Sequence, residues 1–215
     1  MRFLFGISLN SCPVRLSRVT LFSPMILIAF GSNLAGVAGN SVDTLCAAVR
    51  LLAQNGVVVD AASGLYETPP VGPGRQGNYC NAVASVRTKH GPATLLALLA
   101  RIEKQCGRRP GPRWSARVLD LDLLAYGRMV SGWSGDINTL RLGSEAASML
   151  ILPHPRMDIR PFVLRPLIDI APDWRHPVKG RRAQQLWNSV RRSRDARKIT
   201  RISGPEWVTW DRKNR

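Results

Sequence analysis

Acidic residues are scarce in this chain of 215 residues, which has 14 Asp and Glu against 31 Lys and Arg and a formal net charge of +17. A balance this basic favours anionic partners such as nucleotides, nucleic acids or acidic membrane surfaces. The excess is uneven, because residues 181–215 hold eleven Lys and Arg against three Asp and Glu. We interpret this end as a solvated, partly disordered basic tail.

Cysteine is also sparse, and its spacing excludes two classes of small protein. None of the four cysteines forms a CxxC pair, and they lie far apart, which argues against a zinc knuckle or a dense disulfide framework. Reduced thiols in a cytoplasmic protein are the simplest interpretation. The four are Cys12, Cys46, Cys80 and Cys106.

Long apolar runs are absent, so no stretch reaches the ~18 apolar residues that are needed to span a bilayer. Residues 1–24 have some apolar character, but Arg15 and Arg18 interrupt it and no clean small-residue cleavage site follows. We interpret residues 1–24 as an extension or a mis-assigned start, with Met25 as the alternative first residue. An export or targeting signal is the weaker alternative. No membrane partner is expected.

The hydrophobic pattern that remains predicts alternating strands and helices. Apolar or alternating runs predict strands at 26–30, 57–66, 79–88, 118–124 and 150–156. A helix is expected over 42–55 with Ser41 as its N-cap, and another over 92–106 opened by Pro92. A third helix, within 160–172, should be broken at Pro166. The apolar stripes of the first two helices are Val42, Leu45, Val49 and Leu52, then Leu95, Leu98, Leu99, Ile102 and Cys106.

This order predicts a ferredoxin-like βαββαβ unit, which is an α+β fold with helices on one face of an antiparallel sheet. The other face of the sheet should then be free, and a C-terminal addition follows the unit. Residues 25–180 would form the folded domain, with a weakly patterned insertion at 128–148. We expect a monomer.

Two aspartates interrupt the apolar strand "VLDLDLL". Side chains alternate along a strand, so Asp120 and Asp122 share one face while the leucines between and beside them face the core. The same alternation places Tyr79 and Asn81 on the free face of the sheet. A pair of carboxylates facing open space suits Mg²⁺, which prefers one or two carboxylates together with substrate phosphates.

Arginines precede this strand, and arginine is a planar, bidentate phosphate ligand. Carboxylates for a metal and guanidinium groups for phosphate, within fifteen residues, indicate phosphoryl transfer. No Walker-type GxxxxGK loop and no protein-kinase signature set occurs, so side chains must hold any nucleotide. The arginines are Arg108, Arg109, Arg113 and Arg117.

Two other interpretations use the same residues. An RNA-binding module shares the βαββαβ order and the basic charge, but its central strands carry aromatic residues where this chain has aspartates, which repel phosphate. Nucleic acid is therefore a disfavoured partner. A nucleotide-sugar transferase with a DxD motif usually needs a larger α/β domain with alternating units, which this chain lacks.

Six blocks in one order make the pattern specific. They are "GSN" (31–33), "LYETPPVGP" (65–73), "QGNYCNAV" (76–83), "RIEKQCGR" (101–108), "RWSARVLDLDLL" (113–124) and "LPHPRMDIRPFVLRPLIDIAP" (152–172). The series resembles the 6-hydroxymethyl-7,8-dihydropterin pyrophosphokinase family over about residues 26–178. The resemblance implies transfer of a pyrophosphoryl group from ATP to the pterin hydroxymethyl in folate biosynthesis, with AMP leaving.

The resemblance also implies a role for individual residues. Asp120 and Asp122 would bind two Mg²⁺ ions, and Arg108 and Arg117 would act on the phosphates as catalytic residues. The implied contacts to ATP, the co-substrate, are Arg108, Trp114, Arg117, His154 and Arg160. The implied contacts to the pterin are Thr68, Pro69, Val71, Tyr79, Asn81 and Phe162, with Tyr79 and Phe162 stacking on its two faces.

The chain departs from the family pattern in the loop "GRRPGPRWSAR". This loop is one residue shorter than usual, and Ala116 stands where proline is usual. Whether Arg109 or Arg113 replaces a basic residue of the family stays open. The span from Asp122 to His154 is also longer than in short family members, which is why the insertion is placed at 128–148.

Overall fold

The computed structural model describes residues 24–70, 76–111, 115–133 and 150–209. Residues 1–23, most of the expected insertion, and the predicted site residues Val71 and Trp114 therefore lie outside the described residues. Among the residues described, no helix is both long and apolar enough to cross a membrane.

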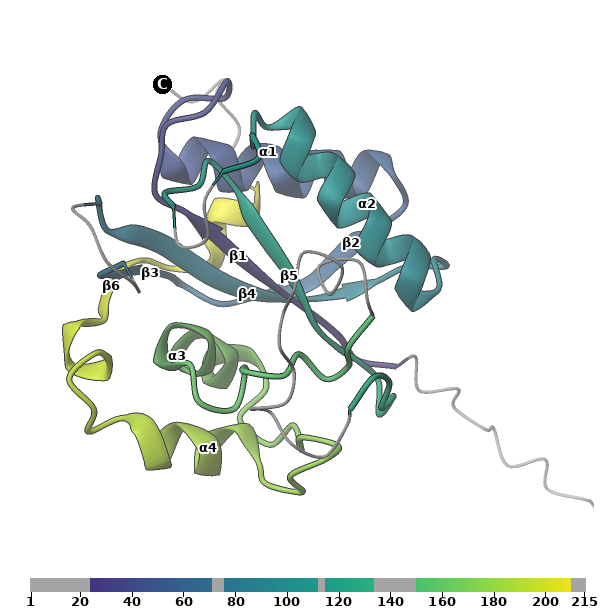
Figure 1. The fold of residues 1–215 in the computed structure, drawn as a ribbon, viewed down its shortest axis with the longest axis vertical. Coiled ribbons are helices and arrows are strands. Elements are labelled where there is room, and N and C mark those ends of the chain that lie inside the picture. Colours follow the sequence, from purple (N-terminus) through teal and green to yellow (C-terminus); the bar gives the residue numbers. More distant parts are fainter. Residues whose placement is uncertain (1–23, 71–75, 112–114, 134–149, 210–215) are drawn as a thin grey trace, which may run out of the picture.

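One antiparallel sheet forms the centre of the fold (Figure 1). Its strands run in the order β5-β1-β4-β3-β6, and β2 also pairs with β4. The antiparallel sheet with helices that is typical of an α+β fold is thus confirmed. The strands are β1 (Ile26–Ser32), β2 (Val58–Ala62), β3 (Leu65–Thr68), β4 (Tyr79–Arg87), β5 (Asp120–Tyr126) and β6 (Thr200–Ser203).

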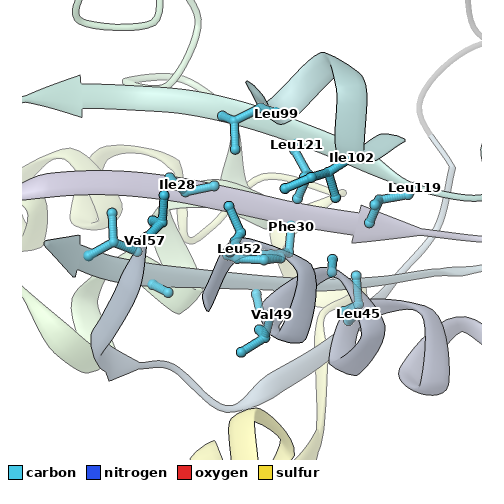
Figure 2. Close-up of a cluster of buried hydrophobic side chains, with 14 of the residues drawn as sticks. Ile28, Phe30, Leu45, Val49, Leu52, Val57, Leu99, Ile102, Leu119 and Leu121 are labelled. Atoms are coloured by element: carbon cyan, nitrogen blue, oxygen red, sulfur yellow. The ribbon is translucent and has the colours of Figure 1, made fainter. Parts of the chain in front are cut away.

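Helices α1 (Ser41–Gln54) and α2 (Pro92–Gln105) cover one face of the sheet (Figure 1). Their apolar stripes meet the inward residues of β1 and β5 in the larger core, which Figure 2 shows in close-up. Leu119, Leu121 and Leu123 are all buried in this core. The predicted stripes and the predicted orientation of the aspartate strand are therefore confirmed.

The expectation that the opposite face stays free is wrong for much of its area. Helices α3 (Pro161–Ile170) and α4 (Ala183–Val190) lie on that face (Figure 1). They bury a second apolar cluster against Leu27, Val83 and Leu124. These residues alternate with those of the first core along their strands, so both faces of the sheet carry apolar side chains. A cavity remains beside the start of α3, where Gly31, Asn81 and Asp120 line it.

The predicted cap of α1 is displaced by one residue. Asn40, and not Ser41, is the N-cap: its Oδ1 accepts a hydrogen bond from the Asp43 N–H at 2.9 Å. Asp43 Oδ2 accepts from the Asn40 N–H at 3.2 Å, which completes a capping box. Asn40 is the cap in place of Ser41 because Asp43, which completes the capping box, lies three residues after Asn40.

The strand predicted over 57–66 is two strands separated at Ser63 and Gly64. Both strands pair with β4, and Ser63 remains bonded to it through Val83. The gap is held by distant partners, since the Trp207 indole N–H donates to the Ser63 carbonyl at 2.9 Å. The Gly64 N–H donates to Asp169 Oδ2 at 3.3 Å.

The predicted strand at 150–156 is only an isolated bridge between Leu152 and Ser131. Pro153 and Pro155 lack the N–H groups that would extend a ladder. The His154 N–H still donates to the Leu124 carbonyl at 2.8 Å, which places this segment beside β5.

The prediction that Pro166 breaks its helix is also wrong, because α3 continues through this proline from Pro161 to Ile170.

The C-terminal segment is not a solvated tail as far as residue 209. After α4 it forms a short helix, η2 (Ala196–Lys198), then β6, which pairs with β3, and a final 3-10 helix, η3 (Pro205–Thr209). The Trp207 ring is buried in the larger core, with its centroid 5.5 Å from that of Phe30. The prediction of a solvated tail is wrong for this segment. Its many basic side chains are mostly exposed, but the buried Trp207 attaches it to the core.

Candidate active site

A glycine opens the floor of a cavity at the uncovered end of the sheet. Gly31 of β1 lies between Asn81 of β4 and Asp120 of β5 in the strand register. A Cβ at Gly31 would stand 3.1 Å from Asn81 Oδ1 and 3.8 Å from Tyr79 Cδ1. The missing side chain therefore leaves space between the polar residues of the two neighbouring strands.

The cavity above this floor has a volume of about 240 Å³ and combines aromatic, amide, acidic and basic side chains. It is bounded by the ends of β1, β4 and β5, the start of α3 and the 154–160 segment. Its polar and aromatic lining residues are Phe30, Thr68, Tyr79, Asn81, Ser115, Arg117, Asp120, Asp122, His154, Arg156, Arg160 and Phe162.

Asp120 lies beneath two guanidinium groups. Its Oδ1 accepts hydrogen bonds from Arg117 and, at 3.0 Å, from Arg108. Burial and the neighbouring Asp122 carboxylate raise the pKa of Asp120, against the lowering effect of the two arginines. The two aspartates thus share a face and repel each other, as their spacing predicts.

Asp122 faces a second pair of basic groups. Its Oδ2 lies 3.6 Å from an Arg160 guanidinium nitrogen and 3.8 Å from His154 Nε2. Burial lowers the pKa of His154, which favours the neutral ring. His154 Nδ1 accepts from the Arg156 backbone N–H at 3.2 Å, so the neutral ring carries its proton on Nε2, toward Asp122.

Aromatic side chains and an oriented amide line the cavity beside the charged groups. Tyr79 and Phe162 both line the cavity, and Arg160 lies over the Phe162 ring at 5.5 Å from its centroid. The buried Asn81 donates from Nδ2 to Thr68 Oγ1 at 2.8 Å, which fixes the amide with its Oδ1 toward Gly31. Aromatic faces and an oriented amide suit a planar heterocycle with donor and acceptor edges.

The structure therefore brings nearly all of the described predicted site residues into one place. Pro69 lines the cavity with the others, and Arg108 reaches it through its bond to Asp120. The prediction missed Arg156, which lines the cavity, and Glu103, which binds Arg108 from behind. Both lie inside blocks that carry the resemblance. The signal for Glu103 was its position five residues before Arg108, whose charge an acid nearby would balance.

The acidic pair fits a divalent cation that arrives with phosphates. Among the described residues, no group of three or more His, Cys, Asp or Glu gathers to hold a metal ion. Asp120 and Asp122 are thus two carboxylates without a third protein ligand of those types, the donor set that Mg²⁺ takes when phosphates and water complete its shell. Burial and the repulsion between the two carboxylates raise the pKa of Asp120, and a bound cation would offset that repulsion.

The sequence is similar to a family model and to bacterial proteins that are named for the same enzyme. Residues 27–172 match the family model described as 7,8-dihydro-6-hydroxymethylpterin-pyrophosphokinase (HPPK). A relative from Synechocystis sp., named 2-amino-4-hydroxy-6-hydroxymethyldihydropteridine pyrophosphokinase, is 37% identical over 159 residues, or 74% of each chain. A relative of the same name from Pseudomonas aeruginosa is 37% identical over 161 residues, covering 75% of this chain and 88% of that one.

Other relatives are much longer than this chain. The mitochondrial folate synthesis bifunctional protein of Arabidopsis thaliana is 40% identical over 145 residues, which is 67% of this chain and 23% of that protein. The crystal structure of Plasmodium falciparum HPPK-DHPS wild type with SDX-DHP aligns with a TM-score of 0.61 at 15% identity, covering 83% of this chain and 47% of that one. This likeness shows a shared fold. The matched family model and the bacterial relatives show that the chain belongs to the 7,8-dihydro-6-hydroxymethylpterin-pyrophosphokinase family.

Proposed function

We propose that the chain transfers the pyrophosphoryl group of ATP to the hydroxymethyl group of 6-hydroxymethyl-7,8-dihydropterin, giving the pterin diphosphate and AMP. One observation carries the proposal: two aromatic side chains, an oriented amide and a pair of carboxylates among arginines line the same cavity. The family and the names of the bacterial relatives support the same reaction. The strand and helix order of residues 26–126 supports a ferredoxin-like core for it.

The ring of the pterin would lie between Tyr79 and Phe162. Asn81, held by Thr68, would read its polar edge together with backbone groups near Pro69 and Val71. Such a clamp orients the hydroxymethyl oxygen toward the aspartates, since Tyr79, Asn81, Asp120 and Asp122 line one cavity. Orientation of two reactants can supply a large part of the barrier reduction in a transfer that needs little covalent help from the protein.

Asp120 and Asp122 would hold two Mg²⁺ ions. When bound, Mg²⁺ neutralises phosphate charge and polarises the attacking hydroxyl. The protein's own groups then hold the triphosphate: Arg117, Arg160 and His154 Nε2–H point at the aspartates, where phosphate oxygens would also bind. The pterin hydroxyl oxygen forms a bond to the β-phosphorus and gives up its proton to solvent, while the bond from that phosphorus to the α-phosphate oxygen breaks and AMP leaves with that oxygen. Trp114, which lies outside the described residues, stays a predicted contact to ATP.

We further propose a cytoplasmic monomer as the working form. The three cysteines within the described part of the chain, Cys46, Cys80 and Cys106, are free and buried, which suits a reducing compartment. This support concerns the thiols alone, so the oligomeric state stays a prediction.

Release of AMP tests the proposed reaction directly. The full chain with MgATP should form AMP and pterin diphosphate in equal amounts when hydroxymethyldihydropterin is present. It should form neither product when the pterin or Mg²⁺ is omitted. Release of ADP, or AMP formation that does not depend on the pterin, would contradict the proposal.

Gly31 offers a test of the cavity floor. Gly31→Ala places a methyl group 3.1 Å from Asn81 Oδ1, which is shorter than an ordinary van der Waals contact, so the amide or the pterin must shift. Because overpacking costs about 1–3 kcal/mol, kcat/KM for the pterin should fall by about tenfold or more. Gly91→Ala is the matched control, since a Cβ there meets no atom within 4 Å. Equal activities of the two variants would mean that the pterin does not approach Gly31.

A further inference from the structure

Strand β5 lies at one end of the sheet, and no strand of the described residues pairs with its outer edge. Leu121 stands on this strand between Asp120 and Asp122. Its backbone N–H donates to Oε1 of Glu103, on α2, at 2.8 Å. A side chain of the covering helix thus takes the place of a neighbouring strand at the point where both proposed metal ligands emerge.

The same oxygen of Glu103 also binds Arg108. One guanidinium nitrogen of Arg108 bonds Glu103 Oε1 and, at 3.0 Å, Asp120 Oδ1. Arg108 therefore lies between a carboxylate in the core and a carboxylate in the site. Its side chain is partly exposed, whereas Glu103 is 8% exposed.

A carboxylate at this depth is costly unless its partners compensate it. Burial raises the pKa of Glu103 to about 7, while Arg108 and the Leu121 N–H act in the opposite direction. A neutral amide could accept the Leu121 N–H without placing a charge at this depth, whereas an apolar side chain would leave that donor unpaired. The negative charge at this position therefore points to a role in orienting Arg108, and its oxygen also holds the aspartate strand through the Leu121 N–H.

We propose that Glu103 is a positioning residue, which holds Arg108 over Asp120 and fixes the edge of β5 between the two aspartates. The inference rests on the proposed function, because Arg108 acts on ATP phosphates in that reaction. Glu103 itself contacts neither substrate: it acts through Arg108 and through the Leu121 N–H. Neutralising it should loosen Arg108 while the fold persists.

A double-mutant cycle separates positioning from simple stability. The variants are Glu103→Gln, Arg108→Ala and the double variant, with Lys104→Gln as a control that removes a charge from the exposed side of the same helix. Glutamine keeps an oxygen for the Leu121 N–H but lacks the charge that holds Arg108. Two quantities are measured in full-length protein: kcat for AMP formation, and the metal-free affinity for a nonhydrolysable ATP analogue.

Glu103→Gln should lower kcat about 10- to 100-fold, the usual effect of losing a group that orients an active-site residue. In the Arg108→Ala background the same change should alter kcat and analogue affinity by less than about threefold. Lys104→Gln should match the unmodified chain. An equal effect of Glu103→Gln in both backgrounds, or none in either, would overturn the proposal.

The proposed function can fail separately from this inference. If the unmodified chain forms no AMP, the reaction is wrong. The affinity cycle with the ATP analogue still decides whether Glu103 acts through Arg108, because it needs no turnover. Faster hydrogen exchange at the Leu121 amide in Glu103→Ala than in Glu103→Gln is also expected, and equal exchange in both would overturn the role of Glu103 at the strand edge.

Discussion

Asp122→Ala should abolish AMP formation from ATP and hydroxymethyldihydropterin while leaving the fold intact. The side chain is about one-third exposed, and its neighbours are the cations Arg160 and His154, so its loss removes little packing. Its removal leaves Asp120 as the single carboxylate and adds unbalanced positive charge where a divalent cation should bind. We expect kcat to fall by about a thousandfold or more, since electrostatic stabilisation dominates phosphoryl transfer.

The control for this variant is Asp173→Ala, which removes an exposed carboxylate paired with Arg182 on the surface. That variant should keep its activity. Circular dichroism and the thermal midpoint should be nearly unchanged in both variants, so that lost activity reports on chemistry. Turnover by Asp122→Ala close to that of the unmodified chain would remove the acidic pair from the mechanism.

Trp207→Ala should lower the free energy of unfolding by about 3–5 kcal/mol, the range for large aromatic residues deleted from a core. The ring is almost fully buried against Phe30, and its N–H donates to the Ser63 carbonyl. The Trp207 carbonyl also accepts from the Cys46 thiol at 3.1 Å. The residue thus ties the C-terminal segment to α1 and to the junction of β2 and β3. Urea unfolding of the full chain measures the effect.

Ile202→Ala provides the comparison on the same segment. Ile202 lies on β6 and is about half exposed, so the change should alter stability by less than about 1 kcal/mol. If Trp207→Ala unfolded at the same urea concentration as the unmodified chain, the C-terminal segment would not be part of the core. The original interpretation of a solvated tail would then return.

The parts of the fold that the sequence predicts well are those with local signals. The period of the leucines in α1 and α2 and the alternation on either side of Asp120 are short-range patterns, and both are confirmed. The clustering of the site follows from them, since antiparallel pairing brings Tyr79, Asn81 and Asp120 to one end of the sheet. The individual roles came from the resemblance, because no local pattern distinguishes a stacking Phe162 from a core phenylalanine.

The parts that could not be predicted depend on distant contacts. The gap between β2 and β3 is held by Trp207 and Asp169, more than a hundred residues away. The C-terminal segment has the pattern of a charge run because exposed arginines surround its few buried residues, such as Ala196 and Trp207. The prediction also missed that helices cover the second face of the sheet. The apolar side of α3 and of α4 does not by itself indicate which face of the sheet the helix packs against.

The most direct test of the account is a crystal structure of the full chain with Mn²⁺ in place of Mg²⁺, a nonhydrolysable ATP analogue and hydroxymethyldihydropterin. The account predicts anomalous peaks for the metal beside Asp120 and Asp122, phosphates against Arg117 and the pterin ring between Tyr79 and Phe162. Metal peaks elsewhere, with both aspartates still bound only to arginines and His154, would contradict it.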